Sequence, residues 1–410
     1  MKSRIWLFLV FVLTGGALAQ TTITWWSPNF HSQRAEVLVE RFHELNPDIR
    51  VNLEVTVSDG LQNRILVALR SGTGPDLIDV ANGWNIPFGL TGGLLALDDR
   101  IAASGLPIDD FLAPALGTAT VDGQLYGLPF RVEAHALIYN RDMYREAGLD
   151  PDAPPQTWDE LLEASKALTG TNAVGQMQYG FGLAGGGEVG NMLFRSLPFI
   201  WMNGGDMLSA DLTRAAINSP EAIEAVEFYV HMLTQDGVAP PSTLQNDGAG
   251  LRRLFIAGTV AQYQSGQFDL PAIRNENPDI DVAAAMIPHP AGRDTAAILG
   301  GWNWVIPDAS RNKDAAWRLL EFLAEPENMG YYTDTFPARL SAMELPRFDD
   351  PDLEPFKAML PFARPQPPVG AWVQIVQAYF DAVQRAMLEE VTVEQAMNEL
   401  AVEIDRLLAR

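Results

Sequence analysis

Three titratable residues alternate with small or apolar ones in the stretch FRVEAHALIYN (130–140). Arg131, Glu133 and His135 are each separated by one residue. Because side chains alternate across a strand, the three are predicted to share one strand face. A carboxylate or guanidinium group on such a face forms hydrogen bonds with the hydroxyl groups of a ligand. The alternative is an ion pair between Arg131 and Glu133 on a solvated face.

Tryptophan is the second residue type that suggests binding chemistry. Trp84 follows the stretch DVANG, just beyond the carboxyl end of an expected strand, where ligands bind in open α/β sheets. Trp302 follows two glycines in LGGWNWVIP (299–307), and Trp304 would share its strand face. We expect one of these two tryptophans to lie in the core and the other to line a cleft. Aromatic rings stack on the C–H faces of sugars, so an acidic, tryptophan-rich cleft predicts a carbohydrate site.

Other motifs in the chain do not indicate catalysis or cofactor binding. GLAGGGEVGN (182–191) contains a GxGxxG string, but it follows no expected strand and lacks the lysine of a phosphate loop. The five histidines show neither HExxH nor a paired spacing, so no metal site is expected. GxSxG is absent, and no catalytic residue is assigned. Tyr331 and Tyr332 could together bind ferric iron, but we prefer a helix end with one tyrosine packed and the other exposed.

The elements that must position these residues alternate between strand and helix. We expect a strand at 22–26, a helix with one apolar stripe from Ala35 to Leu45, a strand from Ile49 to Val57, a helix at about 60–70 and a buried strand at 76–81. The second half of the chain is more helical. This order predicts an α/β protein with a mainly parallel sheet and no simple division into two sequential domains.

The start of the chain and its charge indicate export. Lys2 and Arg4 flank the start of a short apolar run, and small residues at Ala17 and Ala19 complete the pattern of a signal peptide cut after Ala19. There is no cysteine, hence no disulfide and no lipoprotein anchor, so we expect a freely diffusing periplasmic or secreted protein. Without the two basic residues of the leader, 26 basic residues oppose 52 acidic ones, a net charge of −26. That balance disfavours nucleic acid and anionic lipid as partners and suits a neutral or cationic ligand.

Successive segments of the chain resemble one family: the extracellular solute-binding proteins of ABC importers, in the branch that includes the maltose- and trehalose-binding proteins. The segments are PDLIDVANGW (75–84), GGLLALDD (92–99), DGQLYGLPFRVEAHALIYNRDMYREAGL (122–149), PPQTWDELLEASKAL (154–168), FIAGTVAQYQSGQFDL (255–270), LGGWNWVIPDASRNKDAAWRLLEFLAEPENM (299–329) and VTVEQAMNELAVEIDRLL (391–408). Their order and spacing together are specific.

The resemblance implies the type II fold of periplasmic binding proteins. In this α/β fold, two lobes are joined by several crossing segments, and the ligand cleft lies between them. The implied division is a signal peptide at 1–19, a first lobe at 20–131 plus 284–325 and a second lobe at 132–283 plus 326–410.

The resemblance also implies a set of ligand contacts. Glu133 matches the acidic residue that binds sugar hydroxyls in the crossing segment, with Arg131 or His135 as candidates to support it. SGQFDL departs from the commoner tryptophan-bearing version of its segment. The other expected ligand contacts are His31, Asn82, Trp84, Trp201, Phe268, Gly301, Trp302, Arg364 and Trp372.

The expected function is binding of an α-linked disaccharide or short oligosaccharide and its delivery to the membrane permease of an ABC importer. No catalysis, cofactor or metal is expected, and the protein is expected to be a monomer. Glycerol 3-phosphate or one of its diesters is the alternative ligand, although a phosphate prefers a more cationic cleft than scattered arginines provide. A glycoside hydrolase would need two carboxylates about 5–10 Å apart, and only Glu133 can be named from the sequence.

Overall fold

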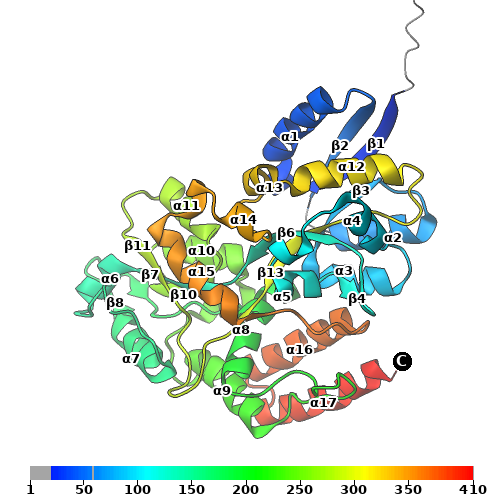
Figure 1. The fold of residues 1–410 in the computed structure, drawn as a ribbon. Coiled ribbons are helices and arrows are strands. Elements are labelled where there is room, and N and C mark those ends of the chain that lie inside the picture. The colour runs from blue at the N-terminus through cyan, green and yellow to red at the C-terminus, as the bar shows by residue number, and fades with distance from the viewer. Residues whose placement is uncertain (1–19, 58–59, 410) are drawn as a thin grey trace, which may run out of the picture.

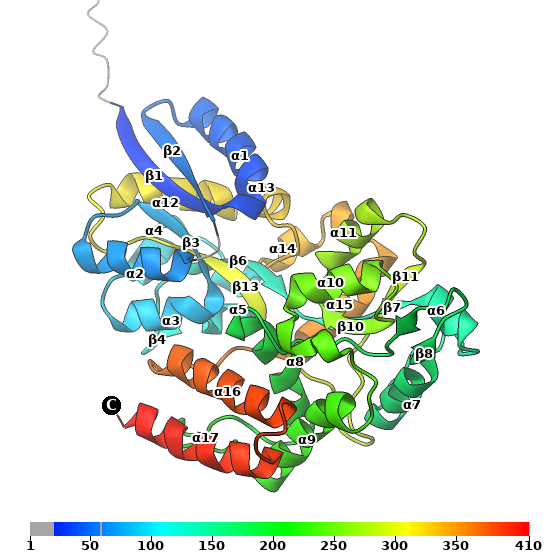
Figure 2. The ribbon, with the colours of Figure 1, turned by 180° about the vertical axis from the view of Figure 1, so that it is seen from behind.

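The computed structural model describes residues 20–57 and 60–409, so the expected signal peptide lies outside the described residues. Strands and helices alternate along the chain, and the strands form two main sheets. One sheet has six strands and the other has three, and each is covered by its own helices (Figures 1 and 2). We call the six-stranded sheet with its helices the first lobe and the three-stranded sheet with its helices the second lobe.

The sheet of the first lobe has the strand order β14-β6-β13-β3-β1-β2. The expected strands at the start of the chain are present in it. Its members are β1 (Thr21–Pro28), β2 (Ile49–Thr56), β3 (Leu77–Ala81), β6 (Leu128–Glu133), β13 (Gly300–Val305) and β14 (Phe336–Pro337). The helices of this lobe are α1 (Ser32–Leu45), α2 (Leu61–Ser71), α3 (Asn82–Leu90), α4 (Asp98–Ser104), α5 (Ala113–Gly117), α12 (Lys313–Ala324), α13 (Pro326–Tyr332) and α14 (Leu340–Met343).

The expectation of a mainly parallel sheet is wrong. β1 pairs in parallel with β2 and β3, but β13 is antiparallel to both β3 and β6, and β14 is antiparallel to β6. The reason is the route of the chain: β13 enters from the second lobe and inserts between two strands that run the other way. Such a non-local insertion leaves no local signal in the sequence.

The sheet of the second lobe is antiparallel throughout, with β7 (Ala136–Asn140) between β10 (Gln262–Ser265) and β11 (Val282–Ala285). Its helices are α6 (Arg141–Glu146), α7 (Trp158–Leu168), α8 (Val189–Met202), α9 (Pro220–Thr234), α10 (Gly248–Ile256), α11 (Asp269–Glu276), α15 (Glu354–Met359), α16 (Trp372–Met387) and α17 (Val393–Leu408). Ser219 caps α9, because its side chain accepts a hydrogen bond from the backbone N–H of Ala222. Short pairs complete the fold: β4 (Thr120–Val121) with β5 (Gln124–Leu125), β8 (Gly170–Thr171) with β9 (Met177–Gln178), and β12 (Ala297–Ile298) with β15 (Ala363–Arg364).

Several segments cross between the lobes, as predicted. The chain passes from β6 to β7 within residues 134–135, and it returns from β11 to β13 along β12, which pairs with β15. The lobe limits themselves remain a proposal. Because β14 pairs with β6 and α14 packs against α13 and β14, we place the end of the second first-lobe segment after Met343 instead of at 325.

The glycine run at 185–187 serves packing. A Cβ atom on Gly186 would lie 2.4 Å from the carbonyl oxygen of Leu244, and Gly187 has a φ of +70° beside Asp247. These glycines therefore let the chain that leads into α8 approach the segment at 243–247.

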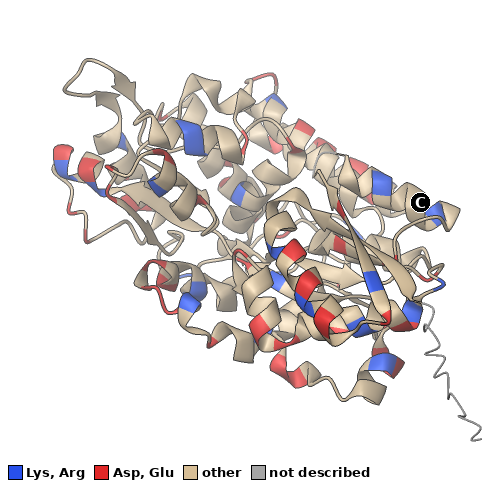
Figure 3. Cartoon of the chain, turned by 90° about the horizontal axis from the view of Figure 1, so that it is seen from above, with Lys and Arg blue, Asp and Glu red and all other residues tan. Residues whose placement is uncertain are grey.

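Charge is spread over both lobes. The full chain has a net charge of −24, and Figure 3 shows acidic residues scattered over the helices of both lobes. Within the described residues, no helix is long and apolar enough to cross a bilayer.

Candidate functional site

A cleft of about 560 Å³ is the largest feature that combines the predicted aromatic and acidic residues. One side of it, the first wall, consists of Asn82, Trp84, Glu133, Gly301 and Trp302, together with the start of α2. The other side, the second wall, comes from the first turns of α8 and α16 and includes Glu188, Val189, Gly190, Phe194 and Trp372.

Strand register explains why the first wall assembles. β3 and β6 end at one edge of the six-stranded sheet, and the antiparallel β13 begins there. Trp302 is opposite Ala81 of β3, and Gly300 is opposite Glu133 of β6. Residues from three distant parts of the sequence therefore meet at the carboxyl ends of β3 and β6.

Glu133 is held by an ion-pair network. Arg131 Nη2 donates to Glu133 Oε2 at 2.5 Å, and Arg131 Nη1 lies 3.2 Å from Asp334 Oδ1. Arg131 Nε also donates to the Thr335 hydroxyl at 3.0 Å. Burial would lower the pKa of Arg131, but the carboxylates of Glu133 and Asp334 raise it above its ordinary value. The ion pair of the alternative interpretation is thus present, but it lies at the cleft with little exposure and not on a solvated face.

The two glycines before Trp302 make room for this network. A Cβ atom on Gly300 would lie 2.7 Å from Glu133 Cγ, and one on Gly301 would lie 2.1 Å from the carbonyl oxygen of Arg131. Gly301 also has a φ of +149°. Both positions therefore require glycine for the pairing of β13 with β6, whatever binds in the cleft.

Aromatic rings form the rest of the first wall. The rings of Trp84 and Trp302 meet edge to face with centroids 5.8 Å apart, and Phe30 meets Trp302 in the same way at 5.2 Å. Trp304 is fully buried and stacks on Phe130 at 4.4 Å. The predicted division between a core tryptophan and a cleft tryptophan on β13 is therefore confirmed.

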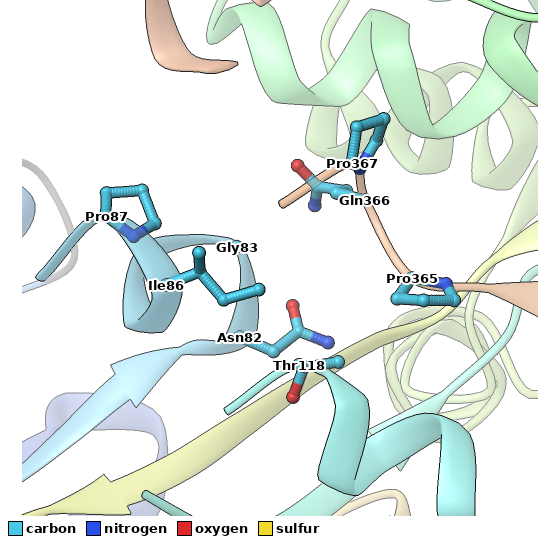
Figure 4. A pocket seen from close by; sticks show the side chains of 8 residues that line it. All are labelled: Asn82, Gly83, Ile86, Pro87, Thr118, Pro365, Gln366 and Pro367. Atoms are coloured by element: carbon cyan, nitrogen blue, oxygen red, sulfur yellow. The ribbon is translucent and has the colours of Figure 1, made fainter. Parts of the chain in front are cut away.

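Trp372 and Glu188 are the main side chains of the second wall. The indole N–H of Trp372 donates to Gln366 Oε1 at 2.6 Å. Gln366 lies on the proline-rich segment at 365–367, which faces the start of α3 across a pocket of about 10 Å³ (Figure 4). That volume is at the lower limit for one water molecule, so this seam is packing between the lobes and no ligand site.

Four expected ligand contacts do not line this cleft. His31 is buried against Asp334, and burial lowers its pKa to about 4 despite the hydrogen bond with that carboxylate. Trp201 is buried in α8 and bonds to Asp206, while Arg364 is exposed and stacks on the Trp201 ring. Phe268 is half-buried at the start of α11. We therefore do not propose these four residues as ligand contacts.

His135 does not share the strand face of Arg131 and Glu133, because β6 ends at Glu133. Its ring lies 5.6 Å from that of Phe194, and burial together with the nearby Arg195 charge lowers its pKa well below the ordinary value. His135 is therefore a neutral buried residue of the second lobe, and the support of Glu133 falls to Arg131.

The structure adds three site residues that the sequence analysis missed. Phe30 is 41% exposed and meets the cleft residue Trp302 edge to face, so in the loop after β1 it is Phe30, and not His31, that lies beside the first wall. Glu188 and Gln366 lie in the irregular stretches GLAGGGEVGN and RPQPPVG. The signal that could have indicated Glu188 and Gln366 is the position of each in an irregular stretch just before a helix.

The tyrosine pair is a helix end, as preferred. Tyr332 closes α13, is fully buried and bonds to Ser27 and Asp79, while Tyr331 is half-buried. Among the described residues, no group of histidine and acidic side chains is placed to hold a metal ion.

A cleft between two α/β lobes, lined by aromatic and acidic side chains, is the arrangement of a solute-binding protein. The family model for the bacterial extracellular solute-binding protein matches residues 28–330, and the chain belongs to this family. The predicted family and fold are therefore confirmed.

Individual relatives agree with this membership. The sn-glycerol-3-phosphate-binding periplasmic protein UgpB of Salmonella typhimurium is 27% identical over 368 residues, which cover 83% of this chain and 80% of that protein. An ABC transporter solute-binding protein of Thermotoga lettingae, solved with α-D-tagatose, has a TM-score of 0.85 at 28% identity and covers 95% of this chain and 100% of its own. The sugar-binding protein MalE of Xanthomonas citri has a TM-score of 0.82 at 26% identity, with 95% and 98% covered.

Proposed function

We propose that this protein binds an α-linked disaccharide or short oligosaccharide in the cleft and delivers it, chemically unchanged, to the permease of an ABC importer. The observation that carries the proposal is the composition of the first wall: two half-buried tryptophans, a carboxylate fixed by Arg131 and the amide of Asn82. The volume of about 560 Å³ lies within the range of about 300–1,000 Å³ that is typical of small-molecule sites.

The roles of the groups follow from their chemistry. Trp84 and Trp302 offer apolar surfaces to sugar rings. Glu133 Oε2 is occupied by Arg131, so Oε1 is left to accept a hydroxyl hydrogen bond. Asn82 Nδ2 donates to the carbonyl of Leu299 at 2.9 Å, which leaves its carbonyl oxygen as an acceptor. A ligand that contacts both walls would stabilise the closed arrangement of the lobes.

The charge of the cleft favours a sugar over a phosphate ester. None of the described residues that line the cleft is lysine, arginine or histidine, and two of them are glutamates. The nearest guanidinium, that of Arg131, is already committed to Glu133 and Asp334. A phosphate dianion would enter such a site without a counter-charge.

Titration calorimetry with maltose, trehalose and longer α-glucans tests the proposal. We expect saturable binding to at least one of them, and we expect Glu133→Gln to weaken it roughly ten- to a hundredfold, because a charged hydrogen bond contributes about 1.5–3 kcal/mol. Glu146→Gln, on the exposed surface of α6, is the matched control and should leave affinity unchanged. Unchanged affinity in Glu133→Gln would refute the assignment of Glu133.

Glycerol 3-phosphate is the second candidate ligand, because a relative that covers most of the chain is named for binding it. The same calorimetry with glycerol 3-phosphate separates the two. Binding of glycerol 3-phosphate with no sugar signal would replace the carbohydrate proposal.

We further propose that the protein is monomeric, acts outside the cytoplasm and catalyses no reaction. Release of reducing sugar from a panel of α-glycosides would contradict the last point, since Glu133 and Glu188 line one cleft.

A further inference from the structure

We propose that the preferred ligand is a sugar that carries a protonated amino group, with Glu188 as the counter-charge for that amine. This inference rests on the proposed function and names the substrate class of the same cleft. It starts from a difference between the two carboxylates that line it.

Glu133 and Glu188 are in opposite electrostatic situations. Glu133 is largely buried, and its charge is balanced by Arg131 at 2.5 Å. The side chain of Glu188 is exposed and has neither a hydrogen bond nor an ion pair with any described residue. Glu188 is also the residue before α8, and its side chain does not cap that helix.

The surroundings of Glu188 offer no cation. Val189, Leu193 and Phe194 of α8 line the same wall, and Trp372 and Val376 of α16 complete it. The described residues of the first wall supply no basic side chain either. Within the described part of the chain, the charge of Glu188 is therefore balanced only by the partial positive charge at the start of α8 and by water when the cleft is open.

Closure of the lobes on a ligand would remove that water. A carboxylate that loses water against apolar and aromatic side chains is costly unless a cation and hydrogen bonds replace the solvent. Because no described residue of the cleft can supply the cation, the ligand is the remaining source. A neutral hydroxyl would compensate Glu188 only in part.

The aromatic lining fits the same chemistry. An ammonium group is attracted to the face of a tryptophan ring, and tryptophan is the best of the aromatic side chains for this contact. Trp84 and Trp302 of the first wall are half-buried and can meet such a group, whereas Trp372 of the second wall is buried. An amino sugar combines this cation with the C–H faces and hydroxyls that the first wall already accommodates.

The test compares trehalose with 2-amino-2-deoxytrehalose, 6-amino-6-deoxytrehalose and their N-acetyl derivatives by calorimetry at pH 7. We expect at least one amine to bind tenfold or more tightly than trehalose. N-acetylation should abolish the gain, because it removes the charge and adds an acetyl group, while trehalose, with a hydroxyl in place of the amine, is the neutral comparison of nearly equal size. Equal or weaker binding of both amines, with trehalose still bound, would overturn the inference and leave the proposed function standing. No binding of any of these or of the other α-glucosides would overturn both.

Glu188→Gln assigns the effect to one side chain. We expect this variant to bind trehalose within twofold of the wild type and to lose the advantage of the amine. Glu325→Gln is the matched control, because Glu325 is also an exposed residue at a helix start without a capping bond, at α13 and outside the cleft. An intact advantage in Glu188→Gln, or the same loss in Glu325→Gln, would show that Glu188 is not the counter-charge.

Discussion

The two walls of the cleft are held in place by different means. The first wall stands on paired strands and a buried network in which Arg131 binds Glu133, Asp334 and Thr335. The second wall stands on the first turns of two helices. Among its described residues, Trp372 donates a hydrogen bond to Gln366, whereas the Glu188 side chain makes no hydrogen bond. Buried, fully bonded groups are positioned before a ligand arrives, whereas exposed ones retain freedom.

This difference suggests a division of labour. A rigid first wall can select the ligand by geometry, and a less constrained second wall can move onto it when the lobes close. If the division is correct, equivalent substitutions should cost more on the first wall than on the second.

The largest contrast is between two glycines that line the same cleft. Gly301→Ala places a Cβ atom 2.1 Å from the carbonyl oxygen of Arg131 at a φ of +149°, so the pairing of β13 with β6 must shift. We expect the free energy of unfolding to fall by roughly 3 kcal/mol or more and sugar binding to be lost. Urea denaturation and calorimetry measure the two effects.

Gly190→Ala is the control for this contrast on the second wall. Its Cβ atom would meet no atom within 4 Å, and the residue lies in the first turn of α8. We expect its stability to stay within about 1 kcal/mol of the wild type or to rise, because alanine is the better helix residue. Equal losses in the two variants would refute the difference between the walls.

Removal of Arg131 should have the next largest effect. Arg131→Met leaves Glu133 and Asp334 without their shared counter-charge. We expect a loss of about 3 kcal/mol, the lower end of the range for breaking a buried pair, because both carboxylates retain some exposure. We also expect at least tenfold weaker sugar binding, measured by calorimetry at a temperature where the variant is folded.

Arg364→Met serves as the comparison for Arg131→Met. Arg364 is exposed and contacts the Trp201 ring at 5.5 Å, an interaction expected to contribute about 1 kcal/mol or less. Its affinity for sugar should not change, because neither Arg364 nor Trp201 lines the cleft. Loss of binding here would restore Arg364 as a ligand contact.

Acid should lower the stability of the first lobe through His31, which bonds to Asp334 behind the first wall. Burial lowers the pKa of His31 to about 4 in the folded state, while the unfolded chain titrates near 6.5. Between these values the unfolded state binds more protons, so this group costs stability as the pH falls from about 6.5 to 4. The cost approaches roughly 3 kcal/mol at pH 4, at about 1.4 kcal/mol per pKa unit.

His31→Gln should remove this contribution. Asp79, whose pKa burial raises to about 7, acts in the opposite direction over the whole of this range, but it does so equally in both proteins. The informative quantity is therefore the difference in unfolding free energy between wild type and variant at pH 7, 5.5 and 4. A difference that stays constant with pH would show that His31 is not buried neutral.

Much of the first wall could be predicted because its residues lie at ends of strands with clear local patterns. Glu133 ends β6, Trp84 lies three residues beyond β3, and Trp302 is the third residue of β13. The alternation or apolar run of each of these short strands is visible in the sequence. Position along a strand is local information, and the edge of the sheet collects such residues. The family resemblance then indicated which of them face the cleft.

The rest depends on contacts that no local pattern records. Phe30 and His31 are neighbours in one turn, and only the packing of His31 against Tyr332 and Asp334 decides that Phe30 faces outward. Trp201 follows Pro198 in α8, and the burial of that helix removes its ring from the cleft. The position of Glu188 at the cleft depends on the close approach of the preceding glycines to the segment at 243–247.

The smallest expected effect is on the second wall, at the bond between Gln366 and Trp372. Gln366→Ala removes the acceptor of the Trp372 indole N–H, and Trp372 is only 2% exposed, so water cannot readily replace that acceptor. We therefore expect the free energy of unfolding to fall by about 1 kcal/mol and the affinity for sugar to fall by up to tenfold. Gln366→Glu keeps an acceptor oxygen at the same position and should recover most of both. If Gln366→Ala matches the wild type in denaturation and calorimetry, Trp372 is held by packing alone. If it instead costs as much as Arg131→Met, the second wall is as rigid as the first, and the division of labour between them is wrong.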